Sequence, residues 1–258
     1  MVRPKKNLGQ HFLWDKNIAL KMVKAFKDAP TPIVLELGPG KGVLTNYLMD
    51  YFGKHFFAVE IDKESIDYLL NTYPALSDQL IQHDFLQMDL GTWFTEPVSI
   101  IGNFPYNISS QIFFKILAYR QTLPFILGMV QKEVAERIVS GPGSKVYGKL
   151  SVMLQAFYRI RILFRVGPQS FVPPPKVKSA VIQLERNERQ RLDCNEALFF
   201  QIVKQSFNQR RKILANSLKS FLLNLKVDDE RFKKRPETLG VEDFIEITNL
   251  LAEGSEKK

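Results

Sequence analysis

Four residues near the middle of the chain, Asn103-Phe104-Pro105-Tyr106, combine a side-chain amide, a proline and an aromatic ring. They follow the apolar run 98–102, which predicts a buried strand that the proline ends. The lone pair of an exocyclic base amine is conjugated with the ring, so such an amine is a weak nucleophile. The Asn103 carbonyl and a neighbouring backbone carbonyl would accept its hydrogens and free the lone pair, while Tyr106 stacks on the base. The stretch predicts chemistry on a base amine, although a turn with Tyr106 in the core explains these four residues equally well.

A glycine-rich turn follows an earlier apolar run. Residues 33–37 predict a strand and residues 43–50 a helix, with Gly38-Pro39-Gly40-Lys41-Gly42 between them. Glycine allows a positive φ and a close approach of the backbone to a ligand. The spacing differs from the Gly-x-Gly-x-x-Gly of dinucleotide folds, and a carboxylate inside the strand suits a cation better than a pyrophosphate. The predicted ligand contacts are Glu36, Gly38 and Gly40.

Two acids stand at the ends of the next predicted strands. Glu60 lies near the end of strand 55–61 and 22 residues after Gly38, where α/β nucleoside binders hold ribose hydroxyls. Asp84 lies just past strand 79–83. Its carboxylate would accept from the exocyclic amine of an adenine, and the Phe85 ring would pack on the face of that base. Either acid alone is more commonly a surface residue or a helix cap.

The elements that must position these residues alternate along the chain. Strands near 33–37, 55–61, 79–83, 98–102 and 125–130 are separated by helices or turns, which predicts a parallel sheet with the candidate residues at one edge. Two further strands, 160–166 and 177–184, are expected to pair antiparallel. From residue 187 onward only helices are predicted, at 196–207, 211–223 and 241–251.

Composition favours a polyanionic partner. The 258 residues carry 36 Lys+Arg against 27 Asp+Glu, a net charge of +9, with 45% hydrophobic residues. A nucleic acid or an anionic membrane surface fits this charge. No apolar stretch is long enough to span a bilayer, and the first dozen residues lack a signal core, so a cytosolic location is expected. The single cysteine and three scattered histidines do not predict a metal site.

The two ends of the chain carry the clearest basic segments. The N-terminus joins Arg3, Lys5 and Lys6 to apolar Leu8, Phe12 and Leu13, which predicts a segment docked over a pocket and not a disordered arm. Residues 204–235 contain ten Lys/Arg against three acids. This density favours phosphate contact over a solvated helical face, chiefly at Arg210, Arg211 and Lys212.

In chain order, the glycine turn, the two acids and Asn-Phe-Pro-Tyr resemble the class I S-adenosylmethionine-dependent methyltransferases. Within that class the chain closely resembles the ribosomal RNA adenine N6,N6-dimethyltransferases over nearly its whole length. The resemblance rests on Lys6-Asn7-Leu8-Gly9-Gln10-His11-Phe12-Leu13, Glu36-Leu37-Gly38-Pro39-Gly40-Lys41-Gly42, Asn103-Phe104-Pro105-Tyr106, Gln131-Lys132-Glu133-Val134-Ala135-Glu136-Arg137 and Phe171-Val172-Pro173-Pro174-Pro175-Lys176-Val177-x-Ser179.

This resemblance implies an α/β fold: a Rossmann-like sheet with its last strand antiparallel, plus a small all-α C-terminal domain. The implied domains are a catalytic domain at 1–186 with an N-terminal docking segment, a helical RNA-binding domain at 187–252 and a frayed tail at 253–258. The implied activity is S-adenosylmethionine-dependent dimethylation of two adjacent adenosines near the 3′ end of small-subunit rRNA, late in subunit assembly. A cytoplasmic monomer acting on a small-subunit assembly intermediate is expected.

The resemblance also implies residue roles. His11, Leu13 and Asn103 would contact the cofactor, although His11 stands where related sequences often carry Asn, and Phe104 replaces a more usual Leu. Pro105 belongs to the catalytic motif, and Phe171 would sandwich the target adenine against Tyr106, with ordinary core packing an equal alternative for Phe171. The residues assigned to RNA contact are Lys5, Lys6, Lys145, Lys149, Arg210, Arg211 and Lys212.

Three other functions fit parts of the pattern. A large-subunit rRNA adenine dimethyltransferase of the antibiotic-resistance type is closest, but the long N-terminal segment and the Phe-x-Pro-Pro-Pro-Lys-Val stretch favour the small-subunit enzymes. A non-catalytic ribosome-assembly factor would not need the intact acids and Asn-Phe-Pro-Tyr. A nicotinamide oxidoreductase is disfavoured by the glycine spacing and the basic charge.

Overall fold

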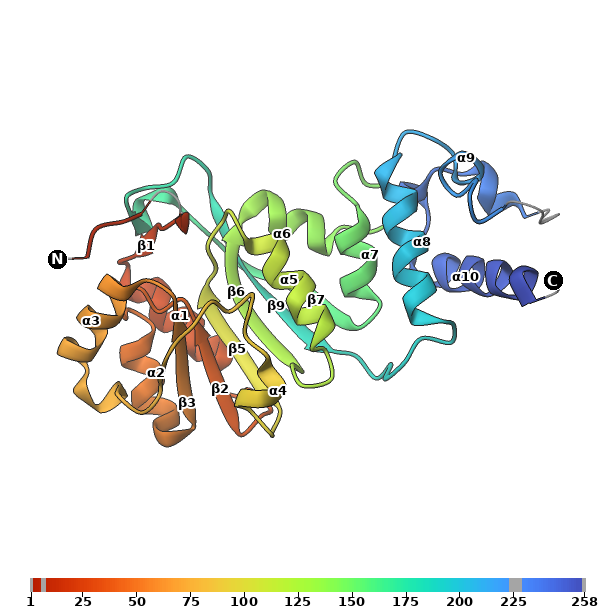
Figure 1. The fold of residues 1–258 in the computed structure, drawn as a ribbon. Helices are drawn as coiled ribbons and strands as arrows, with labels where there is room; N and C mark the ends of the chain where they lie inside the picture. The colour runs from red at the N-terminus through yellow and green to blue at the C-terminus, as the bar shows by residue number, and fades with distance from the viewer. Residues whose placement is uncertain (1, 6–7, 223–228, 257–258) are drawn as a thin grey trace. The chain divides into compact units, whose positions relative to one another are not determined.

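The computed structural model describes residues 2–5, 8–222 and 229–256 (Figure 1). The chain forms two compact units, one of Met1–Ala135 with Arg159–Arg186 and one of Glu136–Tyr158 with Asn187–Lys258. The junction near residue 186 coincides with the domain boundary expected from the sequence. Residues 136–158 differ from that expectation, because they pack with the helical unit although the chain places them before the last strands.

The first unit is built on a seven-stranded sheet with the order β4-β3-β2-β5-β6-β9-β7 (Figure 1). Its strands are β2 (Ile33–Leu37), β3 (Phe56–Glu60), β4 (Leu80–Gln82), β5 (Val98–Asn103), β6 (Phe125–Gln131), β7 (Tyr158–Val166) and β9 (Ser179–Arg186). Neighbouring strands from β4 to β6 pair parallel, whereas β9 pairs antiparallel to β6, as predicted for the last strand. Parallel pairing brings the carboxyl ends of β2, β3, β4 and β5 to one edge.

Helices alternate with these strands along the chain. They are α1 (Lys16–Phe26), α2 (Thr45–Phe52), α3 (Lys63–Thr72), α4 (Leu90–Trp93), α5 (Ser109–Ala118) and α6 (Lys132–Val139), which continues into the second unit. Asp15 caps α1 by accepting from the backbone N–H groups of Asn17 and Ile18 at 3.0 and 3.3 Å. The buried face of α1 carries Met22 and Phe26, which pack with α2, α3 and one face of the sheet in a continuous apolar core.

A separate two-stranded sheet connects the N-terminus to the segment before β9. β1 (Phe12–Leu13) pairs antiparallel with β8 (Phe171–Val172), with Phe12 opposite Val172 and Leu13 opposite Phe171. Both Leu13 and Phe171 are buried in the apolar core. The N-terminal residues are therefore held in place by backbone pairing as well as by side-chain packing.

The second unit is helical. Its elements are α7 (Lys149–Gln155), α8 (Glu196–Asn208), α9 (Leu214–Ser217), α10 (Val241–Glu256) and short 3-10 turns at Glu230–Lys233 and Pro236–Thr238. α8 packs against both α7 and α10. Phe199, Ile202 and Val203 on α8 are buried, and so are Phe244 and Ile247 on α10.

Two helix predictions in this unit are wrong in extent. The helix predicted at 211–223 is only Leu214–Ser217, with turns on either side, and residue 223 lies outside the described residues. The Ser217 hydroxyl donates to the Leu214 carbonyl at 3.3 Å, and local side-chain bonds of this kind compete with helix propagation. The tail predicted to fray from residue 253 is helical through Glu256, and residues 257 and 258 are not described.

No helix in the described ranges combines the length and apolar character required to cross a membrane.

A buried tyrosine in the second unit gives a stability prediction. The Tyr147 ring is fully buried, and its hydroxyl has no hydrogen-bond partner among the described residues. Burial, and then the nearby Asp243 carboxylate, raise the pKa of Tyr147 to about 12. Because an unsatisfied buried hydroxyl is unfavourable, we expect Tyr147→Phe to keep or raise stability, by up to about 1 kcal/mol, in thermal unfolding.

The matched control is Tyr119→Phe in the first unit. It deletes a hydroxyl that donates to Asp89 at 3.1 Å, so a small loss of stability is expected. A loss in Tyr147→Phe larger than that in the control would contradict the prediction.

Candidate active site

A pocket opens at the carboxyl ends of β2, β3 and β5. It is lined by Leu8, Gly9, Gln10, His11, Phe12, Leu13, Glu36, Gly38, Pro39, Gly40, Lys41, Val43, Leu44, Glu60, Ile61, Asp84, Leu86, Asn103, Phe104, Pro105, Tyr106, Asn107 and Ile108. The structure thus brings together nearly every predicted catalytic or cofactor-contacting residue. Phe85 and Phe171 are the two exceptions among those residues.

The glycine turn and Glu60 form one hydrogen-bonded unit. Glu60 is 6% exposed, and its Oε2 accepts from the Gly40 N–H at 3.1 Å. Its Oε1 accepts from the N–H groups of Ile61 and Asp62, both at 2.9 Å. Burial raises the pKa of Glu60, whereas these three backbone donors lower it, and the net shift is upward. The carboxylate is thereby fixed at the pocket wall, where it can accept further hydrogen bonds.

Two glycines of the turn are required by local geometry. Gly38 and Gly40 have φ of 67° and 56°, a conformation that other residues rarely adopt. A Cβ at Gly40 would lie 2.9 Å from the Phe12 ring, so the glycine allows the N-terminal segment to cover the turn. No described atom lies within 4 Å of a Cβ built at Gly38, which leaves that part of the pocket open to a ligand.

Glu36 is a buried carboxyl on β2 that faces the pocket. It is 2% exposed, and its Oε2 accepts from the Thr45 hydroxyl at 2.6 Å. Burial is the largest cause that raises the pKa of Glu36 to about 8, Thr45 opposes it, and Glu60 adds to it. A cationic ligand in the pocket would stabilise the ionised form of this carboxyl.

This raised pKa predicts a pH-dependent stability. A carboxyl whose folded pKa lies above its unfolded value contributes stability that is complete below the unfolded pKa and is lost as pH rises through the folded pKa. Because Glu36→Gln removes the ionisation, we expect the ligand-free variant to match the wild-type Tm near pH 5 and to exceed it by roughly 5–10 °C at pH 9. Thermal scans from pH 5 to 9 measure this difference.

The control for this series is Glu96→Gln, which neutralises an exposed glutamate outside the pocket. Its Tm should follow the wild type at every pH. Parallel pH profiles for Glu36→Gln and the wild type would refute the expected titration of Glu36.

The N-terminal segment is attached to the end of β3 by an ion pair. Lys5 Nζ lies 2.5 Å from Asp62 Oδ1 and 3.1 Å from Glu64 Oε1, and Gln10 donates to Asp62 Oδ2 at 3.4 Å. Burial alone would raise the pKa of Asp62, but hydrogen bonds from Lys5 and Ser65 hold it below its usual value. Lys5, which was predicted to contact RNA, pairs with two carboxylates of its own chain, and Lys6 lies outside the described residues.

Asn103 is oriented by the N-terminal segment. Its Nδ2 donates to the His11 carbonyl at 2.9 Å, which fixes the assignment of the two amide atoms. Its Oδ1 is then left buried, with no hydrogen-bond partner in the described part of the chain. A buried acceptor of this kind is unfavourable unless a ligand donates to it.

Tyr106 is covered by His11, not by Phe171. The His11 and Tyr106 ring centroids are 5.4 Å apart with planes at 29°, and His11 Nδ1 lies 2.8 Å from the Pro173 carbonyl oxygen. The Tyr106 hydroxyl contacts Ser179 Oγ, which fixes the other end of the ring. Phe171 is 1% exposed and packs in the core beside Leu13, so the structure agrees with the core-packing alternative for this residue.

The pocket wall that follows β4 differs from the prediction in one side chain. Asp84 lines the pocket and accepts from the Leu86 N–H at 2.9 Å, which turns the chain. Leu86 therefore faces the pocket, while Phe85 is 5% exposed and does not line it. Sequence reasoning also missed Ile61, which is 52% exposed at the pocket. The sequence feature that could have identified Ile61 is its position as an apolar residue directly after Glu60, the acid that ends β3.

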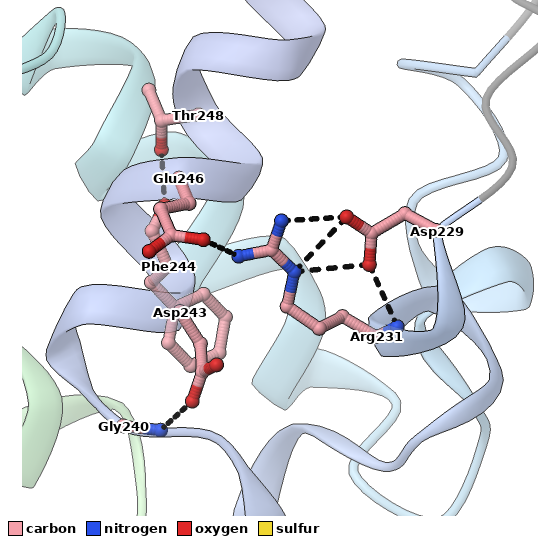
Figure 2. Close-up of polar contacts among 7 residues, drawn as sticks. All are labelled: Asp229, Arg231, Gly240, Asp243, Phe244, Glu246 and Thr248. Atoms are coloured by element: carbon pink, nitrogen blue, oxygen red, sulfur yellow. Dashed lines mark hydrogen bonds and ion pairs between the residues drawn. The ribbon is translucent and has the colours of Figure 1, made fainter.

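Arg231 is a cation of the second unit that is paired with acids of the same unit. Arg231 is engaged by the Asp229 carboxylate and by Glu246 on α10 (Figure 2). The hydrogen bonds between Arg231 and Asp229 are the largest cause of both pKa shifts. They raise the pKa of Arg231 and lower the pKa of Asp229. Nearby, the Gly240 N–H donates to the Asp243 carboxylate (Figure 2). The Thr248 hydroxyl donates to the Phe244 carbonyl (Figure 2).

The residues predicted to contact RNA are not equivalent. Arg210 donates to the Ser144 carbonyl at 3.3 Å, and its Nε lies 3.9 Å from the Glu237 carboxylate. Lys145, Arg211 and Lys212 are exposed, whereas Lys149 is half-buried at the start of α7. The exposed cations of this unit thus include only part of the basic cluster counted in the sequence.

Comparisons with solved structures agree with this architecture. A dimethyladenosine transferase from Plasmodium falciparum superposes with a TM-score of 0.75 at 26% identity, covering 96% of this chain and 98% of that one. The 23S rRNA methyltransferase ErmE superposes with a TM-score of 0.67 at 24% identity, covering 92% and 99%. The sheet order, the antiparallel β9 and the pocket at the strand ends define the class I S-adenosylmethionine-dependent methyltransferase fold.

Sequence comparison defines the family. The model of the family described as ribosomal RNA adenine dimethylase matches residues 1–253, and the chain belongs to this family. A protein of Parabacteroides distasonis named ribosomal RNA small subunit methyltransferase A is 51% identical over 264 residues, covering 100% of this chain and 97% of that protein. A Bacteroides fragilis protein of the same name is 52% identical over 252 residues, covering 96% and 92%.

Proposed function

We propose that this protein dimethylates N6 of two adjacent adenosines near the 3′ end of small-subunit rRNA, with S-adenosylmethionine as methyl donor. The observation that carries the proposal is the buried Oδ1 of Asn103, which has no hydrogen-bond partner among the described residues and lies at the pocket as an acceptor for an exocyclic amine. The names of the relatives at about 51% identity favour the small subunit over the large one. We further propose that the enzyme acts as a cytoplasmic monomer on a late assembly intermediate.

The pocket fits the methyl donor on two structural grounds. Glu36 is a buried carboxyl with a raised pKa, and a cationic ligand suits it. The open space at Gly38 and the fixed Glu60 carboxylate suit a ribose, and Asp84 suits the amine of an adenine. When bound, S-adenosylmethionine supplies a methyl group on a positively charged sulfur, which is a strongly activated leaving group.

The protein's own residues supply positioning. Asn103 Oδ1 accepts a hydrogen of the target amine, which draws the nitrogen toward tetrahedral geometry and frees its lone pair. Tyr106 is proposed to stack on the target base through the ring face that His11 does not cover. A neutral amide at position 103 leaves room for a monomethylated amine to turn and react again. The exposed cations Lys145, Arg211 and Lys212 are proposed to contact rRNA phosphates.

The test is transfer of labelled methyl groups to small ribosomal subunits that lack these modifications, with large-subunit rRNA in parallel. Dimethyladenosine in the small subunit alone is the expected result. Label only on the large-subunit RNA would assign the resistance-type activity, and tight binding without label on either would indicate an assembly factor.

A further inference from the structure

A lysine on α5 binds the backbone of the turn that forms one wall of the pocket. In that turn, which follows β4, Asp84 and Leu86 line the pocket. Lys115 does not line the pocket itself, but its Nζ donates to the Leu86 carbonyl at 3.0 Å and also to the Met88 carbonyl. The ammonium of Lys115 therefore holds the main chain of the segment whose side chains face the ligand.

The carbonyl groups of this turn accept from two kinds of donor. The Asp84 and Phe85 carbonyls accept from the Met88 N–H at 3.0 and 3.3 Å, within the turn itself. The next carbonyl, of Leu86, and that of Met88 accept from the charged Lys115 side chain. Hydrogen bonds from an ionised donor are stronger than those between neutral groups. The bonds that fix the turn thus include two from a residue on a different element.

The Lys115 ammonium lies in a half-buried aromatic environment. Its Nζ is 6.0 Å from the centroid of the Phe85 ring and 5.1 Å from that of the Tyr119 ring. Burial lowers the pKa of Lys115, and the Asp89 and Asp84 carboxylates oppose this shift without cancelling it. An ammonium that is bound to two carbonyls of its own chain is less available to an RNA phosphate than an exposed lysine. A role within the protein is therefore favoured.

We propose that Lys115 is a positioning residue for adenine recognition, because it fixes the turn at 84–88 with the Asp84 carboxylate toward the amine of a bound adenine. Lys115 acts through Asp84, since it does not line the pocket. The inference rests on the proposed function, in which Asp84 accepts from that amine. It identifies the residue that sets the preference of the pocket for adenine over a purine without the amine.

The first experiment measures binding of S-adenosylhomocysteine and of its analogue without the adenine amine by isothermal titration calorimetry. Lys115→Met removes the charge and the donors but keeps a long side chain. We expect it to weaken binding of S-adenosylhomocysteine about 10-fold and binding of the analogue less than about 2-fold, because the analogue makes no hydrogen bond to Asp84. In an Asp84→Ala background, Lys115→Met should not change the preference further, because the acceptor that it positions is gone.

The matched control is Tyr119→Phe at the end of α5. The Tyr119 hydroxyl donates to Asp89 at 3.1 Å, which is another bond between α5 and the segment after β4. Asp89 does not line the pocket. Tyr119→Phe should therefore keep the wild-type preference for the adenine amine.

Hydrogen exchange distinguishes recognition from general stability. In the absence of ligand, the amides of residues 84–89 should exchange about 10-fold faster in Lys115→Met than in the wild type, because the turn opens more often. Faster exchange with an unchanged preference for the amine would show that Lys115 only stabilises the fold, and it would overturn the proposal.

Two other results would also overturn it: an equal loss of affinity for both ligands in Lys115→Met, or the same loss of preference in Tyr119→Phe. A wild type that prefers the amine but methylates no rRNA would instead refute the proposed function. The assignment of Lys115 would then stand, because these measurements need neither RNA nor methyl transfer.

Discussion

Asn103→Ala is expected to reduce dimethyladenosine formation about 10²- to 10³-fold, mainly through kcat. In the wild type, Nδ2 donates to the His11 carbonyl, and the buried Oδ1, which has no partner among the described residues, is the acceptor proposed for the target amine. Loss of one preorganised hydrogen-bonding group at the reacting atoms typically costs roughly this much in rate. Single-turnover methylation of small subunits, with products separated as mono- and dimethyladenosine, measures the effect.

The Asn103→Ala result requires a control that shows the variant is folded. The Tm should change little in Asn103→Ala, because the deleted amide makes one hydrogen bond to the protein. A loss of affinity for S-adenosylhomocysteine would instead indicate the cofactor contact that the resemblance implies for Asn103. Asn46→Ala, at an exposed position of α2 outside the pocket, should leave all three measurements unchanged. An undiminished dimethyl yield in Asn103→Ala would remove the role assigned to Asn103.

Glu60→Gln is expected to weaken binding of S-adenosylhomocysteine by about 10²-fold and to lower the Tm. The carboxylate accepts from three backbone N–H groups, of Gly40, Ile61 and Asp62. An amide has one oxygen, so its NH2 group must face at least one of these donors, and a buried donor without an acceptor costs about 1–3 kcal/mol. Loss of the proposed ribose acceptor and of the hydrogen bond that orders the glycine turn accounts for the expected weaker binding.

Isothermal titration calorimetry and thermal unfolding measure the two effects of Glu60→Gln. Glu96→Gln serves again as the exposed control and should retain wild-type affinity. Wild-type affinity in Glu60→Gln would show that ligand binding does not need this carboxylate.

The sequence alone predicted the parts of the site that depend on local order. Apolar runs followed by Gly38, Glu60, Asp84 and Asn103 predicted strands that end in polar residues, and parallel strands bring such ends to one edge. The helix predicted at 196–207 is α8 (Glu196–Asn208), because the Asn195 cap and apolar periodicity act within a few residues.

Side-chain direction after a strand was not predictable in the same way. Whether Phe85 or Leu86 meets the pocket depends on a turn that Asp84 closes through its own carboxylate. His11 lines the pocket as expected, but it also stacks on Tyr106 where Phe171 was one expectation, because the pairing of β1 with β8 accompanies the burial of Phe171 in the core. Strand pairing between residues about 160 positions apart leaves no periodic signal in either segment.

Charge and packing partners were also decided by tertiary structure. Lys5 looked like a phosphate-binding cation in sequence, yet its partner Asp62 lies 57 residues away. Residues 136–158 precede the last strands but pack with the helical unit. The sequence by itself determined which chemical groups stand at the strand ends, because that depends on neighbours along the chain. The tertiary structure decided which of these groups face the pocket and which are neutralised, because hydrogen bonds and ion pairs join residues distant in sequence.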